Sequence, residues 1–130
     1  MRETILFKAL SDPIRLRLAS LLATAGEQCV CVLAQALDEP DFKISRHLGI
    51  MRSAGMVESR REGTWIYYKL VEPHNEIEES LQKCLRIHMK DHETVKEDLK
   101  RLEVASCSTE PGIKRTTDSE TDQMEVESNG

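Results

Sequence analysis

Residues 41–70, DFKISRHLGIMRSAGMVESRREGTWIYYKL, decide the fold of this chain. Their first half repeats apolar residues at helical spacing, among them Ile44 and Leu48, and Gly55 ends the repeat. Their second half alternates apolar and polar residues around a polar centre, which predicts a β-hairpin with its turn at Glu62-Gly63. A helix followed at once by a hairpin indicates the second half of a winged helix-turn-helix.

The sequence before residue 41 predicts three further helices. The first is short and lies at the N-terminus. The second begins at Pro13, which suits the first helical position, with Ser11 or Asp12 as its cap. The third runs from about Val30 to Leu37 and is closed by Pro40. Two short helices joined tightly and followed by a hairpin predict that the helix in residues 41–55 enters the DNA major groove.

One long helix is predicted to begin near Pro73, because apolar residues and histidines recur at steps of three and four. Such a seam suits packing against a second subunit, so the expected fold is mainly α with a β-hairpin wing, dimeric, with a long C-terminal dimerisation helix. Residues 1–104 are expected to form this domain, and residues 105–130 an acidic, disordered tail. The seam consists of Ile77, Leu81, Leu85, His88, His92, Val95, Leu99 and Leu102.

The composition of the 130 residues, 39% apolar and 32% charged, is typical of a soluble globular protein. No apolar run approaches the roughly 20 residues that span a bilayer, so no membrane partner is expected, and a reduced, cytoplasmic location fits the irregular cysteine spacing. The net charge of −5 is unevenly distributed. Residues 41–70 carry six Lys and Arg against three acidic residues, whereas residues 104–130 carry six acidic residues against two basic ones. The basic middle is what a DNA-contacting surface needs.

Polar side chains gather at the start of the predicted recognition helix and just before the hairpin tip. There they either reach base edges and phosphates or form an ordinary solvated face. The predicted DNA contacts are Lys43, Ser45, Arg46, His47, Arg60 and Arg61.

Residues 27–37, EQCVCVLAQAL, place two cysteines one residue apart at the start of an apolar helix. Cys29 and Cys31 could be small core residues, a redox pair or metal ligands. In a chain without a disulfide framework, a close cysteine pair more often binds metal or does redox chemistry.

Four motifs, LSDPIRLRLASLL, EQCVCVLAQAL, KISRHLGIMRSAGMV and REGTWIYYKL, follow one another along the chain. With them, about residues 3–100 resemble the ArsR/SmtB family of dimeric, metal-sensing winged-helix repressors, and its arsenical-responsive members in particular. The resemblance implies a non-enzymatic repressor that binds double-stranded operator DNA as a homodimer. It also implies that Ser45 and His47 are recognition-helix contacts, that the cysteine pair is a ligand site, and that the first and last helices form the dimer interface.

The inducer that the resemblance implies is trivalent arsenic or antimony, without an organic cofactor, and such soft ions favour thiolates. In a regular helix, side chains at i and i+2 point about 200° apart, so we expect ion binding at Cys29 and Cys31 to unwind the first turn and move the recognition helix. The family pattern CVCDLC has a third cysteine where this chain has Ala34. A third thiolate from Cys107, or solvent, would complete the site, and Cys84 is expected to be a packed core residue.

Three alternatives remain. A repressor of the same fold could sense cadmium, lead or zinc, or could respond to thiol oxidation. His88, Asp91 and His92 could hold a divalent ion, although histidines on an apolar seam are more often interface residues. A thiol-disulfide oxidoreductase is disfavoured because no strand is predicted before Cys29.

Overall fold

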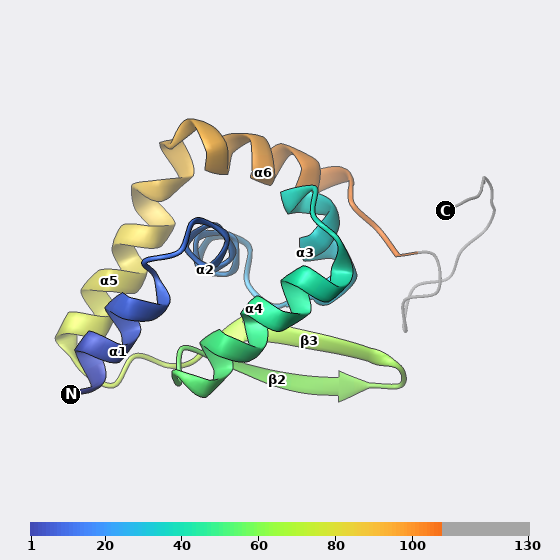
Figure 1. Ribbon diagram of the computed structural model, residues 1–130. Helices are drawn as coiled ribbons and strands as arrows, with labels where there is room; N and C mark the ends of the chain where they lie inside the picture. Colours follow the sequence, from blue (N-terminus) through green and yellow to red (C-terminus); the bar gives the residue numbers. More distant parts are fainter. Residues whose placement is uncertain (108–130) are drawn as a thin grey trace.

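The computed structural model describes residues 1–107 and is mainly helical, with one three-stranded antiparallel sheet in the order β1-β3-β2 (Figure 1). The predicted fold class, mainly α with a hairpin wing, is confirmed. The predicted disordered tail lies, beyond residue 107, outside the described residues. The elements are α1 (Arg2–Ala9), α2 (Pro13–Ala25), β1 (Gln28–Cys29), α3 (Val30–Leu37), α4 (Asp41–Ser53), β2 (Val57–Glu62), β3 (Trp65–Leu70), α5 (Glu76–Ile87), the 3-10 turn η1 (Met89–Asp91) and α6 (Glu93–Val104).

Local signals set the ends of the N-terminal helices. Asp12 caps α2, because its Oδ2 accepts a hydrogen bond from the backbone N–H of Arg15 at 3.1 Å, and Pro13 occupies the first turn. Asp38 ends α3 in the left-handed conformation, with φ 57°, and Pro40 precedes α4. The connection between α3 and α4 is therefore as tight as the sequence predicts.

The core surrounds α2, which the arch of α5 and α6 encloses on one side while α3 and α4 cover the other (Figure 1). Each fully buried aliphatic side chain contributes about 1.5–3 kcal/mol relative to exposure. The largest side chains without exposed surface include Leu18 and Leu21 of α2, Leu33 and Leu37 of α3, and Ile44, Leu48 and Met51 of α4.

The prediction of a single long C-terminal helix is wrong, because the structure has two helices there, α5 and α6, joined through η1. The helical conformation is interrupted at His92, whose backbone is extended (φ −67°, ψ 135°). Its Nδ1 accepts a hydrogen bond from the backbone N–H of Thr94 at 3.2 Å. Because of this break, both halves pack on α2: Leu85 of α5 and Val95 of α6 are buried. A straight helix could contact α2 along only part of its length.

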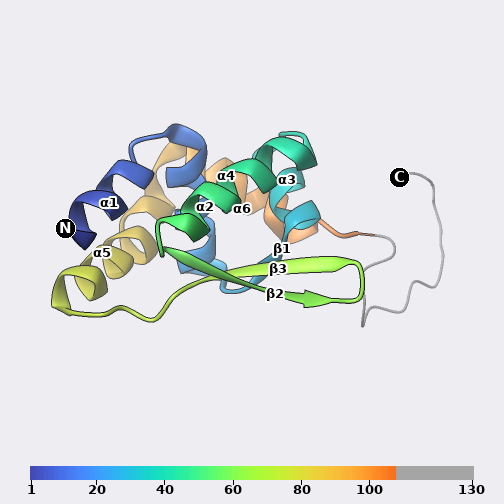
Figure 2. The same cartoon turned by 60° about the horizontal axis from the view of Figure 1, so that its bottom comes forward.

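The hairpin is confirmed, but its turn is one residue later than predicted. Glu62 pairs with Trp65, so the turn residues are Gly63 and Thr64, and Gly63 takes a φ of 64° that favours glycine. A third strand was missed, because two residues are too few for an alternating pattern. This strand, β1, pairs with β3 beside the start of α3 (Figure 2).

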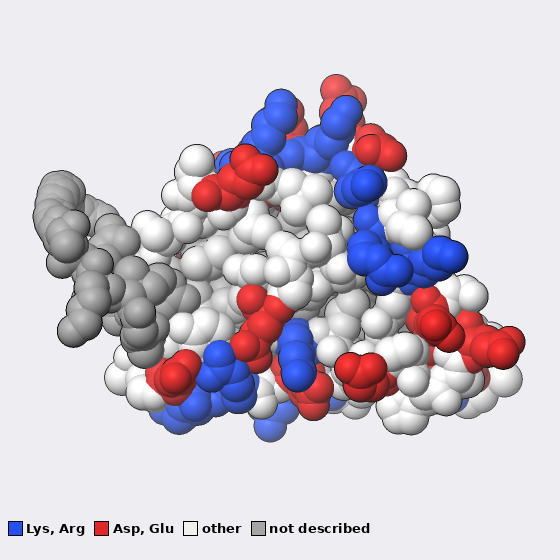
Figure 3. Space-filling view, turned by 180° about the vertical axis from the view of Figure 1, so that it is seen from behind, with Lys and Arg blue, Asp and Glu red and all other residues white. Residues whose placement is uncertain are grey.

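No helix among the described residues is long and apolar enough to cross a membrane. On the side opposite to that of Figure 1, a broad area of the surface carries few charged side chains, and positive and negative side chains mix around it (Figure 3).

A buried carboxylate joins α2 and α6 to the end of α3. Asp98 is fully buried and accepts hydrogen bonds at 2.9 Å from Nε and Nη2 of Arg17 and at 2.8 Å from Nη2 of Arg101. Asp98 thereby raises the pKa of the Arg17 guanidinium. The same arginines donate to α3 carbonyls, Arg17 to Leu37 O at 3.1 Å and Arg101 to Ala36 O at 2.7 Å. The network fixes α6 against the helix that precedes α4.

Asp98→Asn should therefore lower the free energy of unfolding by about 3 kcal/mol, because it leaves two partly buried guanidinium groups without their charged partner. Urea unfolding at neutral pH measures this. Glu97→Gln is the matched control, since the ion pair of Glu97 among residues 1–107 is with Lys100 on the surface at 3.6 Å, and it should change stability by less than about 0.5 kcal/mol. Equal stability of the two variants would contradict the role given to Asp98.

Candidate metal centre and nucleic-acid interface

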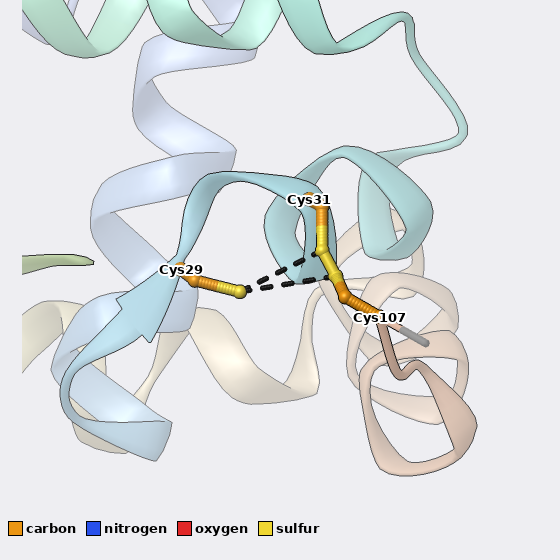
Figure 4. A group of neighbouring side chains, drawn as sticks. All are labelled: Cys29, Cys31 and Cys107. Atoms are coloured by element: carbon orange, nitrogen blue, oxygen red, sulfur yellow. Dashed lines mark hydrogen bonds between the residues drawn. A yellow bond between two sulfur atoms is a disulfide. The ribbon is translucent and has the colours of Figure 1, made fainter. Parts of the chain in front are cut away.

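Three cysteine sulfurs meet in the interior (Figure 4). Cys29 Sγ lies 3.7 Å from Cys31 Sγ and 3.9 Å from Cys107 Sγ. Cys31 and Cys107 are paired as a disulfide, with their Cα atoms 6.4 Å apart. All three residues are buried, and their ligand atoms lie within 4.8 Å of one another. The structure thus brings together the three predicted metal-ligating residues.

The first two sulfurs converge because Cys29 does not belong to a helix. It is the last residue of β1 and the N-cap of α3, with extended backbone angles (φ −85°, ψ 159°), and the regular helix begins at Val30. The expectation that Cys29 and Cys31 point to opposite sides of a helix is therefore wrong. They approach each other while α3 stays regular, so capture of an ion by this pair does not require α3 to unwind.

The third sulfur comes from the segment directly after α6. Gln35 of α3 holds this segment: its Nε2 donates to Ser106 O at 2.7 Å and to Cys107 Sγ at 3.9 Å, and its Oε1 accepts from the backbone N–H of Ser106 at 3.3 Å. Cys107 therefore reaches the cysteine pair within one subunit. Cys84, expected in the core, is instead exposed on α5.

The surroundings of the three thiols favour a soft ion. Apolar and aromatic side chains pack around them, and three thiolates are ligands that suit a soft ion better than a hard, hydrated one. The N-terminus of α3, with its partial positive charge, lies at the thiols and favours negatively charged thiolates. The three cysteines form one buried cluster with Val32, and the side chains packed against this cluster are Trp65, Tyr67, Leu102 and Ala105.

The alternative zinc ligands are not assembled. His88, Asp91 and His92 are all exposed, and His92 serves as the cap of α6. Within residues 1–107, the three cysteines are the single group of three or more potential ligands that lie close enough to share an ion.

The predicted DNA contacts separate into two groups. On α4, Ser45 and Arg46 are exposed, and Lys43 is half-buried with its Nζ 3.1 Å from Glu39. Arg61 is exposed on β2. Ser45, Arg46 and Arg61 are thus accessible from outside the protein, whereas Lys43 pairs with Glu39 and the other two predicted contacts also make bonds within the chain.

Arg60 is held by the protein itself. Its guanidinium lies 4.5 Å above the Tyr67 ring and donates to both carboxylate oxygens of Glu27, at 2.9 Å from Nε to Oε2 and 2.9 Å from Nη2 to Oε1. A further bond joins Nη1 to Glu62 at 3.0 Å. Glu27, and after it Glu62, raises the pKa of Arg60. Sequence reasoning missed Glu27, because no local pattern links residues that far apart.

His47 turns inward from α4. It is 7% exposed, and its Nδ1 lies 3.1 Å from Arg15 Nη1 and 3.8 Å from Asp12 Oδ2. Since an arginine only donates, Nδ1 accepts, and the proton of the neutral ring is on Nε2. Burial lowers the pKa of His47, Arg15 adds to this, and Asp12 opposes it. The imidazole thus joins α4 to the start of α2.

This geometry gives stability a pH dependence. The folded-state pKa of His47 lies below its ordinary 6.5, so the unfolded chain binds the proton first, and stability present above about pH 6.5 is lost as the pH falls below it. His47→Gln should flatten the dependence of the unfolding free energy between about pH 7.5 and 5.5, measured in urea. His88→Gln, at an exposed histidine, should retain the wild-type slope. A His47→Gln slope as steep as that of the wild type would contradict the assignment.

The comparisons with known proteins converge on one family. The family model described as bacterial regulatory protein, arsR family, matches residues 12–59. An uncharacterized HTH-type transcriptional regulator of Methanocaldococcus jannaschii, MJ1325, is 46% identical over 67 residues, which are 52% of this chain and 75% of that protein. The chain belongs to the arsR family. Members of this family are regulatory proteins, so the expectation that the chain is not an enzyme is confirmed.

Other arsR-family relatives carry more specific names. The arsenic resistance transcriptional regulator ArsR2 of Pseudomonas putida is 53% identical over 64 residues, 49% of this chain and 56% of that protein. A cadmium resistance regulatory protein CadC homolog of Staphylococcus aureus is 38% identical over 68 residues, 52% of this chain and 56% of that protein. The match thus spans little more than half the length of these two relatives. The homodimeric winged helix-turn-helix domain of Mb0332 from Mycobacterium bovis has a TM-score of 0.55 at 31% identity, covering 71% of this chain and 85% of that one.

Proposed function

We propose that this chain is a cytoplasmic transcriptional repressor that binds double-stranded operator DNA as a homodimer and dissociates when trivalent arsenic or antimony binds the thiolates of Cys29, Cys31 and Cys107. The observation that carries the proposal is the meeting of three buried sulfurs within 4.8 Å. Three thiolates supply the soft ligands that a trivalent metalloid prefers. The arsenic-resistance name of the relative that is 53% identical supports the choice of inducer.

The DNA-binding part of the proposal assigns α4 to the major groove. Ser45 and Arg46 would reach base edges or phosphates from the exposed side of α4, with Lys43 beside them, and Arg61 would meet the backbone from the hairpin. Because His47 is turned toward Arg15, its contribution would be to hold α4 in place.

The homodimer part of the proposal uses α1 and α5, which lie side by side (Figure 1). Arg2 joins them, donating from Nε to Glu78 Oε2 at 2.6 Å, and holds the pKa of that carboxyl at about 2. Beyond this pair, large apolar side chains are exposed: Ile5 by 51%, Phe7 by 54% and Ile77 by 55%. A second copy covering this surface would place two recognition helices about a two-fold axis, as a palindromic operator requires.

Substitution of the thiols tests the inducer site. In reduced protein, Cys29→Ser or Cys31→Ser should abolish release by arsenite while operator affinity stays within about twofold, because the site lies outside the DNA surface. Fluorescence anisotropy with a duplex that the wild-type chain selects from a random library measures both quantities. Cys107→Ser should weaken release, and Cys84→Ser, at the exposed cysteine, should match the wild type. Undiminished release from both the Cys29 and Cys31 variants would refute the site.

Substitution on α1 tests the dimer. Phe7→Glu should raise the dimer dissociation constant at least about tenfold, because it places a charge in the apolar interface. Sedimentation equilibrium measures this. Phe42→Glu is matched in chemistry, since Phe42 is 76% exposed but lies on α4, and it should leave the dimer intact. If Phe42→Glu dissociates the dimer and Phe7→Glu does not, the interface lies elsewhere.

A second candidate function is a repressor of the same fold that responds to thiol oxidation. It is favoured by the pairing of Cys31 with Cys107 as a disulfide. Under an excess of a phosphine reductant, arsenite should still release the protein from DNA if the metalloid is the inducer. Release by diamide or peroxide alone would favour the oxidation response instead, and release by cadmium or zinc but not arsenite would favour a divalent-metal sensor.

A further inference from the structure

The residue that carries the first thiol is a strand partner of the hairpin. Cys29 pairs with Tyr67 of β3, and Tyr67 pairs with Arg60 of β2. Residues directly opposite one another in adjacent strands project from the same face of a sheet. Cys29, Tyr67 and Arg60 therefore form a row across the three strands, with the thiol centre at one end and the hairpin guanidinium at the other.

The Arg60 side chain also connects the far end of this row back to the segment that precedes Cys29. Its side chain crosses the Tyr67 ring and reaches back to Glu27, which stands two residues before Cys29. The same Tyr67 packs against the buried cluster that the three cysteines form with Val32. Glu27 thus lies on the short segment that leads into the thiol centre.

A DNA phosphate that binds Arg60 through the bidentate edge formed by Nε and Nη2 must displace Glu27 from it. A guanidinium that donates from Nε and Nη2 to one carboxylate has spent its bidentate edge, and Nη1 is bonded to Glu62. The ion pair is half exposed, with 50% of the Arg60 side chain accessible. Exposed pairs of this kind are weak, so the closely spaced phosphates of a duplex can compete for the guanidinium.

We infer that Glu27 is an internal competitor of DNA for Arg60, and that the thiol centre governs this competition. When the operator is bound, Arg60 leaves Glu27 for a backbone phosphate. When the three thiolates hold an ion, the segment before Cys29 is immobilised against β3, Glu27 stays in reach of Arg60, and the phosphate contact is lost. The inference rests on the proposed function and gives it a route through the hairpin, in place of an unwinding of α3.

The first test uses the reduced full chain without metalloid and the duplex selected by the wild type. Glu27→Gln should tighten DNA binding about 3–10-fold and steepen the slope of log affinity against log salt concentration by about one, because one more phosphate contact forms. In an Arg60→Ala background, Glu27→Gln should leave DNA affinity and its salt dependence unchanged, since no guanidinium remains for Glu27 to hold. Equal tightening with and without Arg60 would overturn the inference, because it would show only the loss of a negative charge.

The second test adds saturating arsenite and compares the ratio of dissociation constants with and without it. In Glu27→Gln this ratio should fall at least about threefold below that of the wild type. The variant should still bind one arsenite per chain, as followed by the fluorescence of the single tryptophan, Trp65, which packs against the cluster that contains the three cysteines. Glu62→Gln is the matched control: it removes the other carboxylate partner of Arg60, which lies on β2 and not on the segment before Cys29, and should keep the wild-type ratio.

If the ratio of dissociation constants with and without arsenite is the same in Glu27→Gln as in the wild type, the thiol centre does not control Arg60 and the inference is overturned. If arsenite fails to release even the wild-type chain, the proposed function is wrong. The first test then still decides whether Glu27 competes with DNA for Arg60, because it contains no metalloid.

Discussion

The pairing of β1 with β3 is the constraint on which the rest of this structure depends. It holds the backbone extended up to Cys29 and makes this residue the N-cap of α3. A single extended residue then turns two thiols that would diverge in a helix toward each other, at 3.7 Å. The same pairing attaches the thiol centre to the hairpin, so the site shares one small sheet with the hairpin that we propose to meet DNA.

A second constraint brings in the third thiol. The break at His92 bends α6 over α2 and α3, and buried Asp98 fixes it there through Arg17 and Arg101. The end of α6 consequently delivers residues 105–107 to Gln35 on α3. The centre therefore joins segments 76 residues apart in the chain, Cys31 and Cys107. Ion binding at such a centre favours the arrangement in which β1, α3 and the end of α6 are held together.

The sequence predicted the features that depend on local chemistry. A cap of α2 at Ser11 or Asp12, the bounds of α3, the tight turn to α4 and the hairpin all follow from patterns within a few residues, and the structure selects Asp12 as the cap. The interruption of the helix at His92 could not be predicted from the sequence, because the apolar seam continues across it and only packing on α2 requires the bend. The missed strand β1 has two residues, too few for periodicity, and it overturned the helical geometry expected for Cys29.

The candidate site was predictable in composition but not in geometry. Soft-ion chemistry selected the cysteines, whereas the partners of Arg60 and His47 arise from tertiary contacts that no spacing encodes. Both residues were predicted to face DNA, and both make bonds within the protein.

An X-ray absorption spectrum at the arsenic edge, recorded on the reduced full chain loaded with one equivalent of arsenite, tests the central claim most directly, because it counts the atoms bound to the ion. The account predicts three sulfur neighbours in the wild type and two, with a lighter atom in the third place, in Cys107→Ser. A shell of oxygen or nitrogen neighbours would contradict it. So would a number of sulfur neighbours that stays the same when Cys29 or Cys31 is replaced by serine.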